Sequence, residues 1–146
     1  MQIQRIDHIG VVVDDLAAAK EFFIDFGFTV QGEATEQSEL LDKVAGVNGA
    51  QSQIVFLQAP NNQLALELTK FLNPADVPAS QETEMYARGI KHLAFVVENI
   101  EEIVANVKQK GWDVFVDVYN YKDVYKLCYF RGPEGIIIEL AEQLQK

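Results

Sequence analysis

The chain has 146 residues, about the size of one ordinary domain, and 49% of them are apolar, which is too many for a disordered protein. Its 22 acidic and 12 basic residues give a formal net charge of -10, which repels the phosphates of nucleic acids and anionic membrane surfaces. We therefore expect a small molecule as partner, with no nucleic acid and no membrane, and a cytoplasmic location because the N-terminus lacks a signal-peptide pattern.

The first predicted elements are a strand and a helix. Residues 6–13, IDHIGVVV, form an apolar run typical of a strand, and Asp15 can cap the helix that follows. That helix is predicted to end at Gly27, where a left-handed residue costs least. One face of the helix carries the apolar residues that would pack on a sheet: Leu16, Ala19, Phe22, Phe23 and Phe26.

An insertion and a hairpin complete the first half. Residues 33–51 carry a short helical pattern at Leu40, Leu41 and Val44. Residues 56–60 and 64–68 then predict two strands joined by a turn that contains proline and asparagine.

The second half repeats the first. IDHIGVVVDDL from Ile6 matches IKHLAFVVENI from Ile90 with an offset of 84, and the closing hairpins match with an offset of 72. Asn99, followed by Glu102, predicts a capping box at the start of the second helix, which is expected to end at Gly111. We therefore predict one α+β domain, residues 1–146, made of module 4–70, linker 71–87 and module 88–144. A doubly wound parallel sheet is the alternative, but neither half has a glycine-rich phosphate loop.

The two histidines of the chain, His8 and His92, occupy equivalent positions in the repeat. Glu67 and Glu139 are likewise equivalent, and each lies in a strand between apolar residues, where an unpaired charge would be costly. Small residues lie two positions from three of the four: Gly10, Ala65 and Ala94. Two imidazoles and two carboxylates suit one divalent ion, either Zn, Ni, Co, Mn or Fe(II). Core histidines and glutamates paired with lysine at the sheet rim are the alternative interpretation.

The sequences around these four residues resemble the vicinal oxygen chelate superfamily, which includes glyoxalase I, methylmalonyl-CoA epimerase, extradiol dioxygenases and the fosfomycin and bleomycin resistance proteins. The resemblance rests on HIGVVVDDL at His8, LALEL at Glu67, KHLAFVVENI at His92 and FRGPEGIIIELAE at Glu139. It implies two paired βαβββ modules that form a cupped eight-stranded mixed sheet with the helices outside, and a homodimer. It also implies that these four residues are the metal ligands.

The resemblance further implies a function. The metal would bind two neighbouring oxygens of a small 2-oxo or thioester substrate, and Glu67 and Glu139 would act as acid and base in a lyase or isomerase of the glyoxalase I type. The second carboxylate, Glu67, disfavours an extradiol dioxygenase, which resembles a site of two histidines and one carboxylate. A methylmalonyl-CoA-type epimerase, a dioxygenase and a non-catalytic binder of small molecules such as antibiotics are the alternatives.

Several residues near the second hairpin are further candidates. Tyr121 and Tyr125 are candidate substrate contacts, although aromatic residues in strands more often serve packing. Lys126 and Arg131 could bind a carboxylate or phosphate, with solvated rim charges as the alternative. Cys128 is expected to be a buried strand residue and not a nucleophile.

Overall fold

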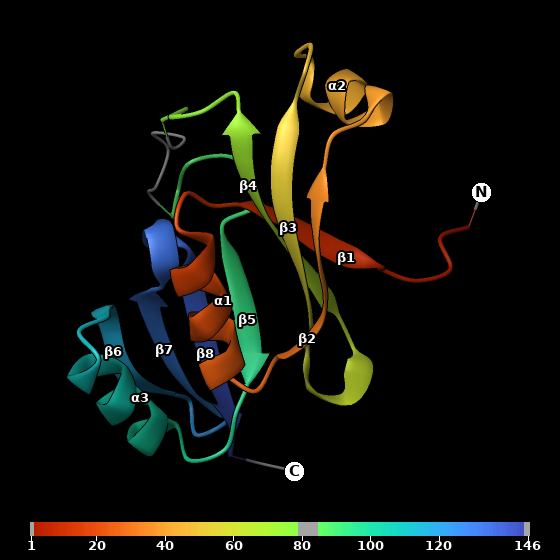
Figure 1. Ribbon diagram of the computed structural model, residues 1–146. Helices are drawn as coiled ribbons and strands as arrows, with labels where there is room; N and C mark the ends of the chain where they lie inside the picture. The colour runs from red at the N-terminus through yellow and green to blue at the C-terminus, as the bar shows by residue number, and fades with distance from the viewer. Residues whose placement is uncertain (1, 79–84, 145–146) are drawn as a thin grey trace. The chain divides into compact units, whose positions relative to one another are not determined.

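The computed structural model describes residues 2–78 and 85–144. The chain divides into two compact units, one up to residue 79 and the other from residue 80 (Figure 1). Each unit has the order strand, helix and three further strands, and the first unit adds a short helix between its second and third strands; this order confirms the predicted α+β class and the paired βαβββ modules. The strands form two four-stranded sheets, one in each unit. Within the described residues, no helix is long and apolar enough to cross a membrane.

The first unit is built on a mixed sheet with strand order β1-β4-β3-β2, in which only the pairing of β1 with β4 is parallel. Its elements are β1 His8–Val12, α1 Leu16–Asp25, β2 Thr29–Glu36, α2 Glu39–Ala45, β3 Gln51–Gln58, a 3-10 turn Pro60–Asn62 and β4 Ala65–Asn73.

Helix α1 begins and ends where the sequence predicts. The Asp15 carboxylate accepts a hydrogen bond from the backbone N–H of Ala18 at 3.0 Å, and Gly27 adopts a φ of 90° after the last turn. The helix packs against β3 and β4. Three of its residues that face the core are buried, namely Ala19, Phe22 and Phe23. Because Leu66 and Leu68 of β4 are also fully buried, one face of this sheet forms the core and the other is available for a site.

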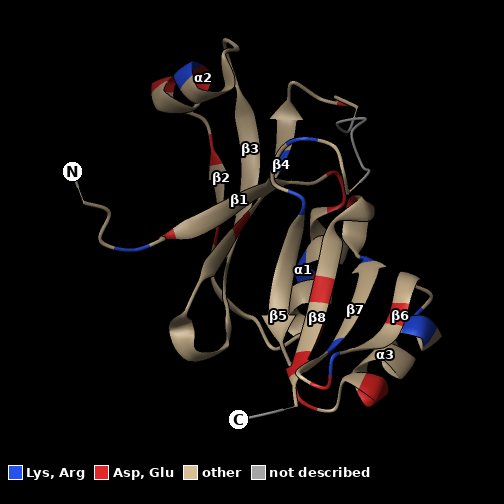
Figure 2. Cartoon of the chain, turned by 180° about the vertical axis from the view of Figure 1, so that it is seen from behind, with Lys and Arg blue, Asp and Glu red and all other residues tan. Residues whose placement is uncertain are grey.

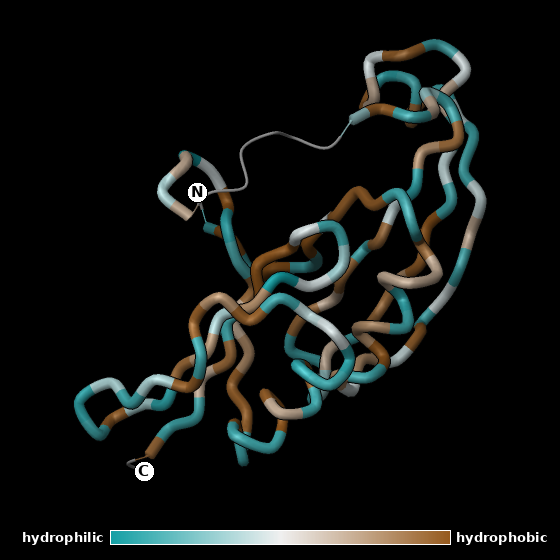
Figure 3. The backbone as a smooth tube through the Cα atoms, turned by 90° about the vertical axis from the view of Figure 1, so that its left-hand side faces the viewer, coloured by the Kyte–Doolittle hydropathy of each residue, from teal (hydrophilic) through white to brown (hydrophobic). Residues whose placement is uncertain are grey.

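The second unit repeats this plan with strand order β5-β8-β7-β6, and β5 pairs in parallel with β8. Its elements are β5 His92–Val96, α3 Ile100–Gln109, β6 Asp113–Tyr121, β7 Tyr125–Arg131, a 3-10 turn Pro133–Gly135 and β8 Ile137–Gln143. Figure 3 shows hydrophobic stretches alternating with hydrophilic ones along the backbone, and the buried apolar residues of β7 and β8 include Phe130, Ile138 and Leu140. This apolar face of the second sheet packs against α3 and forms the core of the unit.

The capping box predicted at the start of α3 is wrong. Asn99 has a left-handed backbone (φ 59°, ψ 51°) and its side chain makes no cap, because a capping side chain needs an extended backbone to reach back to the first turn. The carboxylate of Glu142 in β8 takes its place and accepts hydrogen bonds from the N–H groups of Asn99 and Ile100, both at 3.1 Å. Figure 2 shows the acidic residues of β8 as red segments of its ribbon. The start of α3 is thus capped by a residue that lies 43 positions after Asn99 and 42 positions after Ile100.

The Glu142→Ala variant is expected to lower the free energy of unfolding by about 1–2 kcal/mol, because two helix N–H groups lose a charged acceptor. Glu102→Ala is the matched control, since this residue lies in the first turn of the same helix and the predicted capping box assigned the cap to it. We expect that control to change stability by less than about 0.5 kcal/mol. Urea unfolding followed by circular dichroism measures both, and equal losses would contradict the assignment of the cap to Glu142.

Candidate functional site

In the first unit, His8 and Glu67 lie on the same face of the sheet. The parallel register places His8 opposite Ala65 and Gly10 opposite Glu67, so the imidazole and the carboxylate belong to adjacent strands two positions apart. The His8 Nε2 atom is 3.5 Å from the Glu67 Oε2 atom. A Cβ atom built on Gly10 would meet no atom within 4 Å, so this glycine leaves open space beside the pair.

Polar and aromatic neighbours surround this pair. The His8 Nδ1 atom lies 2.9 Å from a carboxylate oxygen of Asp7, whose other oxygen is 2.6 Å from the Arg5 guanidinium. The hydrogen bond to His8, followed by the positive charge of Arg5, holds the pKa of Asp7 below its ordinary value. The Thr69 hydroxyl donates to Glu67 at 3.4 Å. These contacts define an imidazole with one nitrogen bonded and the other facing a carboxylate.

The second unit holds an equivalent pair. The register places Ala94 opposite Glu139, and the His92 Nε2 atom is 3.0 Å from the Glu139 Oε2 atom. Tyr129 of β7 pairs with Glu139 across the sheet, and its ring meets the His92 ring edge to face at 6.1 Å between centroids. Burial, together with a hydrogen bond to Glu139 and the negative charge of that carboxylate, raises the pKa of Tyr129. The hydroxyl therefore remains a neutral donor that holds Glu139 in place.

In each pair, the distance between the histidine nitrogen and the glutamate oxygen is close to the distance between two ligand atoms of a single metal ion. Two ligand atoms that each lie about 2.1 Å from one ion are roughly 3.0–3.4 Å apart when the ion is octahedral or tetrahedral. The Nε2 to Oε2 distances of 3.5 and 3.0 Å are close to this spacing. An imidazole nitrogen and a carboxylate oxygen are also the donors that borderline divalent ions accept. Each unit thus offers one imidazole nitrogen and one carboxylate oxygen at a spacing suited to a divalent ion.

The four candidate substrate residues divide between the two faces of the second sheet. The regular register of β7 with β8 places Tyr125 and Arg131 on the face that carries Glu139, and Tyr121 joins them by pairing with Tyr125. Arg131 lies over the Phe115 ring at 5.3 Å.

Lys126 points to the opposite face, which packs on α3. Its ammonium group forms an ion pair with Glu101 of that helix, and this hydrogen bond, followed by the charges of Glu101 and Glu142, raises the pKa of the lysine. The contact with Glu101 explains the position of Lys126 without a bound ligand.

Cys128 is fully buried beside Lys126 in β7, and burial raises the pKa of its thiol to about 11. Because a raised pKa leaves only about one thiol in a thousand ionised at pH 8, we expect negligible reaction of the native protein with Ellman's reagent at that pH. The same protein in 6 M guanidinium, roughly the concentration that unfolds most domains, should react within seconds to minutes. Equal rates in both states would contradict the burial of this thiol.

Sequence reasoning missed Asp7, Thr69 and Tyr129 as neighbours of the candidate ligands. A signal existed for Asp7, which directly precedes His8 in the chain. For Thr69, period-two alternation from Glu67 predicts the same face. The position of Tyr129 follows only from the pairing of β7 with β8.

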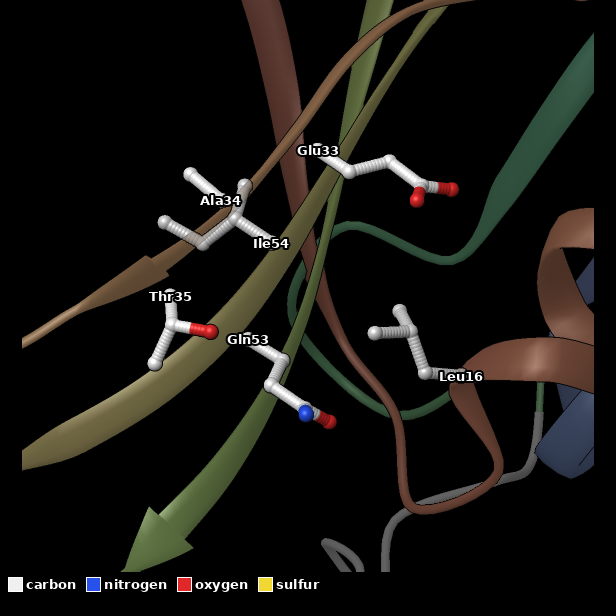
Figure 4. A pocket seen from close by; sticks show the side chains of 6 residues that line it. All are labelled: Leu16, Glu33, Ala34, Thr35, Gln53 and Ile54. Carbon is white, nitrogen blue, oxygen red and sulfur yellow. The ribbon is translucent and has the colours of Figure 1, made fainter.

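A cavity of about 360 Å³ lies elsewhere in the first unit (Figure 4). Its lining comes from the start of α1 and from β2 and β3: Leu16, Glu33, Ala34, Thr35, Gln53 and Ile54. In Figure 4 the side chains of Glu33, Gln53 and Leu16 extend toward the same space. The Glu33 carboxylate already forms an ion pair with Lys20 of α1, and neither His8 nor Glu67 lines the cavity. The cavity is therefore separate from the His–Glu pair.

Comparisons with known proteins agree with the observed fold. Residues 5–140 match the family model described as the Glyoxalase/Bleomycin resistance protein/Dioxygenase superfamily. The uncharacterized protein YaeR of Escherichia coli is 31% identical over 145 residues, which cover 97% of this chain and 98% of the relative. A glyoxalase family protein from Bacillus cereus has 32% identity and a TM-score of 0.92, with 99% and 97% of the two chains covered. The fosfomycin resistance protein FosX of Listeria monocytogenes, solved with Mn(II) and sulfate, is 17% identical with a TM-score of 0.62, and 97% and 93% of the chains are covered.

Proposed function

Because the chain belongs to the Glyoxalase/Bleomycin resistance protein/Dioxygenase superfamily, we propose that it is a metal-dependent lyase or isomerase of the glyoxalase I type. Its substrate in this proposal is a small 2-oxo compound or thioester, and its reaction is a proton transfer next to a carbonyl. The observation that carries the proposal is the repeated pair of a histidine nitrogen facing a glutamate oxygen, at 3.5 Å in one unit and 3.0 Å in the other.

The four residues of these two pairs are the proposed metal ligands: His8, Glu67, His92 and Glu139. Four nitrogen and oxygen donors suit one divalent ion among Zn, Ni, Co, Mn and Fe(II). When bound, the ion supplies Lewis-acid polarisation of the substrate's carbonyl oxygen. A protein that only sequesters a small molecule has no need of such a donor set.

Glu67 and Glu139 are the proposed acid and base. One carboxylate accepts the proton from the carbon beside the carbonyl, and a carboxylic acid returns it to the product. The surroundings of the two carboxylates differ, because the Tyr129 hydroxyl forms a hydrogen bond with Glu139 whereas the Thr69 hydroxyl donates to Glu67 at 3.4 Å. Both glutamates are partly exposed to solvent on the same sheet face as their histidine.

Substrate binding in this proposal involves the face of the second sheet that carries Glu139. Tyr121 and Tyr125 offer flat apolar surface and hydroxyl groups there, and Arg131 offers a guanidinium that can bind a carboxylate.

We further propose that the protein is a homodimer, since both described sheets end in edge strands, β1 and β2 in one and β5 and β6 in the other, and edge strands need to be covered. Light scattering at micromolar concentration is expected to give about twice the 16.4 kDa mass of one chain. A mass of one chain under these conditions would contradict the dimer. The measured mass tests only the oligomeric state, and the proposed reaction is tested separately by deuterium exchange.

Deuterium exchange tests the proposed function. The protein is freed of metal, loaded separately with Zn, Ni, Co, Mn or Fe(II), and incubated in D₂O with the hemithioacetal of a 2-oxo aldehyde or with a 2-methyl-branched acyl thioester. We expect one ion per set of four ligands and metal-dependent deuterium incorporation next to the carbonyl. Exchange of the branched thioester alone would favour the epimerase. Stoichiometric metal binding with no exchange in either substrate would contradict the catalytic proposal.

A further inference from the structure

Four polar groups in the first unit form a continuous chain of contacts. The Arg5 guanidinium contacts one oxygen of Asp7 at 2.6 Å, and the other oxygen of Asp7 contacts the His8 Nδ1 atom at 2.9 Å. The opposite nitrogen of the ring, Nε2, then faces Glu67 at 3.5 Å. The imidazole therefore lies between two carboxylates, and each carboxylate meets a different ring nitrogen.

The chemistry of these groups determines where the imidazole proton resides. An ionised carboxylate only accepts hydrogen bonds, and a neutral imidazole has one N–H and one nitrogen with a free lone pair. The shorter contact of 2.9 Å is a normal hydrogen-bond distance, whereas 3.5 Å is at the long limit. The proton thus belongs on Nδ1, and the lone pair of Nε2 is directed toward Glu67.

We propose that Asp7 is a positioning residue that holds His8 in the Nδ1–H tautomer and aims its Nε2 lone pair at the metal position beside Glu67. The ion is part of the proposed function, on which this inference rests. Carboxylate partners of this kind orient ligand histidines and raise their affinity for metals about 10- to 100-fold. The Arg5 guanidinium contacts the second oxygen of Asp7. On the other side of the ring, Glu67 is the carboxylate that faces Nε2.

The second unit provides a natural comparison. Lys91 stands 84 residues after Asp7 and directly before His92, and an ammonium group cannot accept a hydrogen bond from an imidazole. The residue before the histidine therefore acts differently in the two halves of the repeat. Because Asp7 and Arg5 are mostly exposed, we expect the effect of Asp7 to be at the lower end of the range, about tenfold.

The experiment compares Asp7→Ala, Asp7→Asn and the matched control Lys91→Ala with the full-length parent protein. Long-range ¹H–¹⁵N NMR of the metal-free proteins, at a pH where both imidazoles are neutral, reports the tautomer of each of the two histidines, with His92→Ala to assign the signals. Competition titration with Zn²⁺ and Mn²⁺ then measures metal affinity. Asparagine retains an oxygen acceptor at the same position, so it tests rescue by a conservative change.

We expect His8 to be in the Nδ1–H form in the parent protein and in Asp7→Asn, and to shift toward the Nε2–H form in Asp7→Ala. Metal affinity should fall about tenfold in Asp7→Ala, and by less than about threefold in Asp7→Asn and Lys91→Ala. The same His8 tautomer in the parent and in Asp7→Ala, or equal losses of affinity in Asp7→Ala and Lys91→Ala, would overturn the inference. A parent protein that binds no ion stoichiometrically would overturn the proposed function instead, since the tautomers are measured without metal.

Discussion

The Glu139→Gln variant is expected to lower the rate of metal-dependent deuterium exchange by about 10²–10⁴-fold, the usual contribution of a positioned acid or base. Glutamine keeps the shape of the side chain and one oxygen, but it cannot accept the substrate's proton. The neighbouring Tyr129 hydroxyl can still donate to that oxygen, so the local packing should survive. The measurement is exchange by NMR at saturating metal, with metal content determined on the same sample.

Glu142→Gln is the matched control for this experiment. This residue lies three positions later on the same strand, but its carboxylate turns to the other face and caps α3. The control should exchange at the rate of the parent protein when it is corrected for the folded fraction. Full exchange by Glu139→Gln, or equal losses in both variants, would remove Glu139 from the proposed chemistry. Glu67→Gln tests the second carboxylate in the same way.

The Phe23→Ala variant is expected to lower the free energy of unfolding by about 3–5 kcal/mol, because it empties a large volume in a closely packed core. Phe23 is fully buried, and its ring lies 5.1 Å from the Phe22 ring and 5.4 Å from the Phe28 ring between centroids. Urea unfolding measures the loss. Ile24→Ala is the control on the same turn of α1, since this side chain is 42% exposed and should cost less than about 1 kcal/mol.

Similar losses in the two variants would contradict the orientation of α1 on its sheet. The comparison depends on one helical step, because residues 23 and 24 lie about 100° apart around the helix axis. The experiment therefore tests which face of α1 is buried, because both substitutions change the helix propensity of the segment by a similar amount.

Local patterns in the sequence predicted the first strand, the long helix and the closing hairpin of each unit. The apolar alternation around His8 and the helical spacing of Phe22 and Phe23 describe groups only a few residues apart, whose geometry follows from the backbone. Asp15 as helix cap and Gly27 as helix end were also confirmed, because both depend on neighbours within one turn. The repeat strengthened these predictions, since two segments with the same pattern imply the same unit twice.

The composition of the candidate site also follows from the sequence, whereas its contacts do not. Matching positions in the repeat identified two histidines and two glutamates as candidates before any contact was known. The distance from His8 to Glu67 depends on the parallel register of β1 with β4, strands that are more than 50 residues apart in the chain. No local pattern specifies that register, because it results from packing two distant apolar faces on one core.

Where a side chain has several possible partners, only the tertiary structure decided which contact it makes. Asn99 and Glu102 had the local pattern of a capping box, yet Glu142 supplies the cap because strand β8 brings its carboxylate to the start of α3. Lys126 and Tyr125 are adjacent in sequence, yet one pairs with Glu101 and the other lies on the face of Glu139. The sequence by itself determined the repeated order of strand, helix and hairpin, because these elements depend on backbone periodicity. It also supplied the residue types of the candidate site, and the family resemblance implied the βαβββ modules. The caps, ion pairs and hydrogen bonds depend on which strands lie side by side, and a long flexible side chain bonds to the partner that folding brings within its reach.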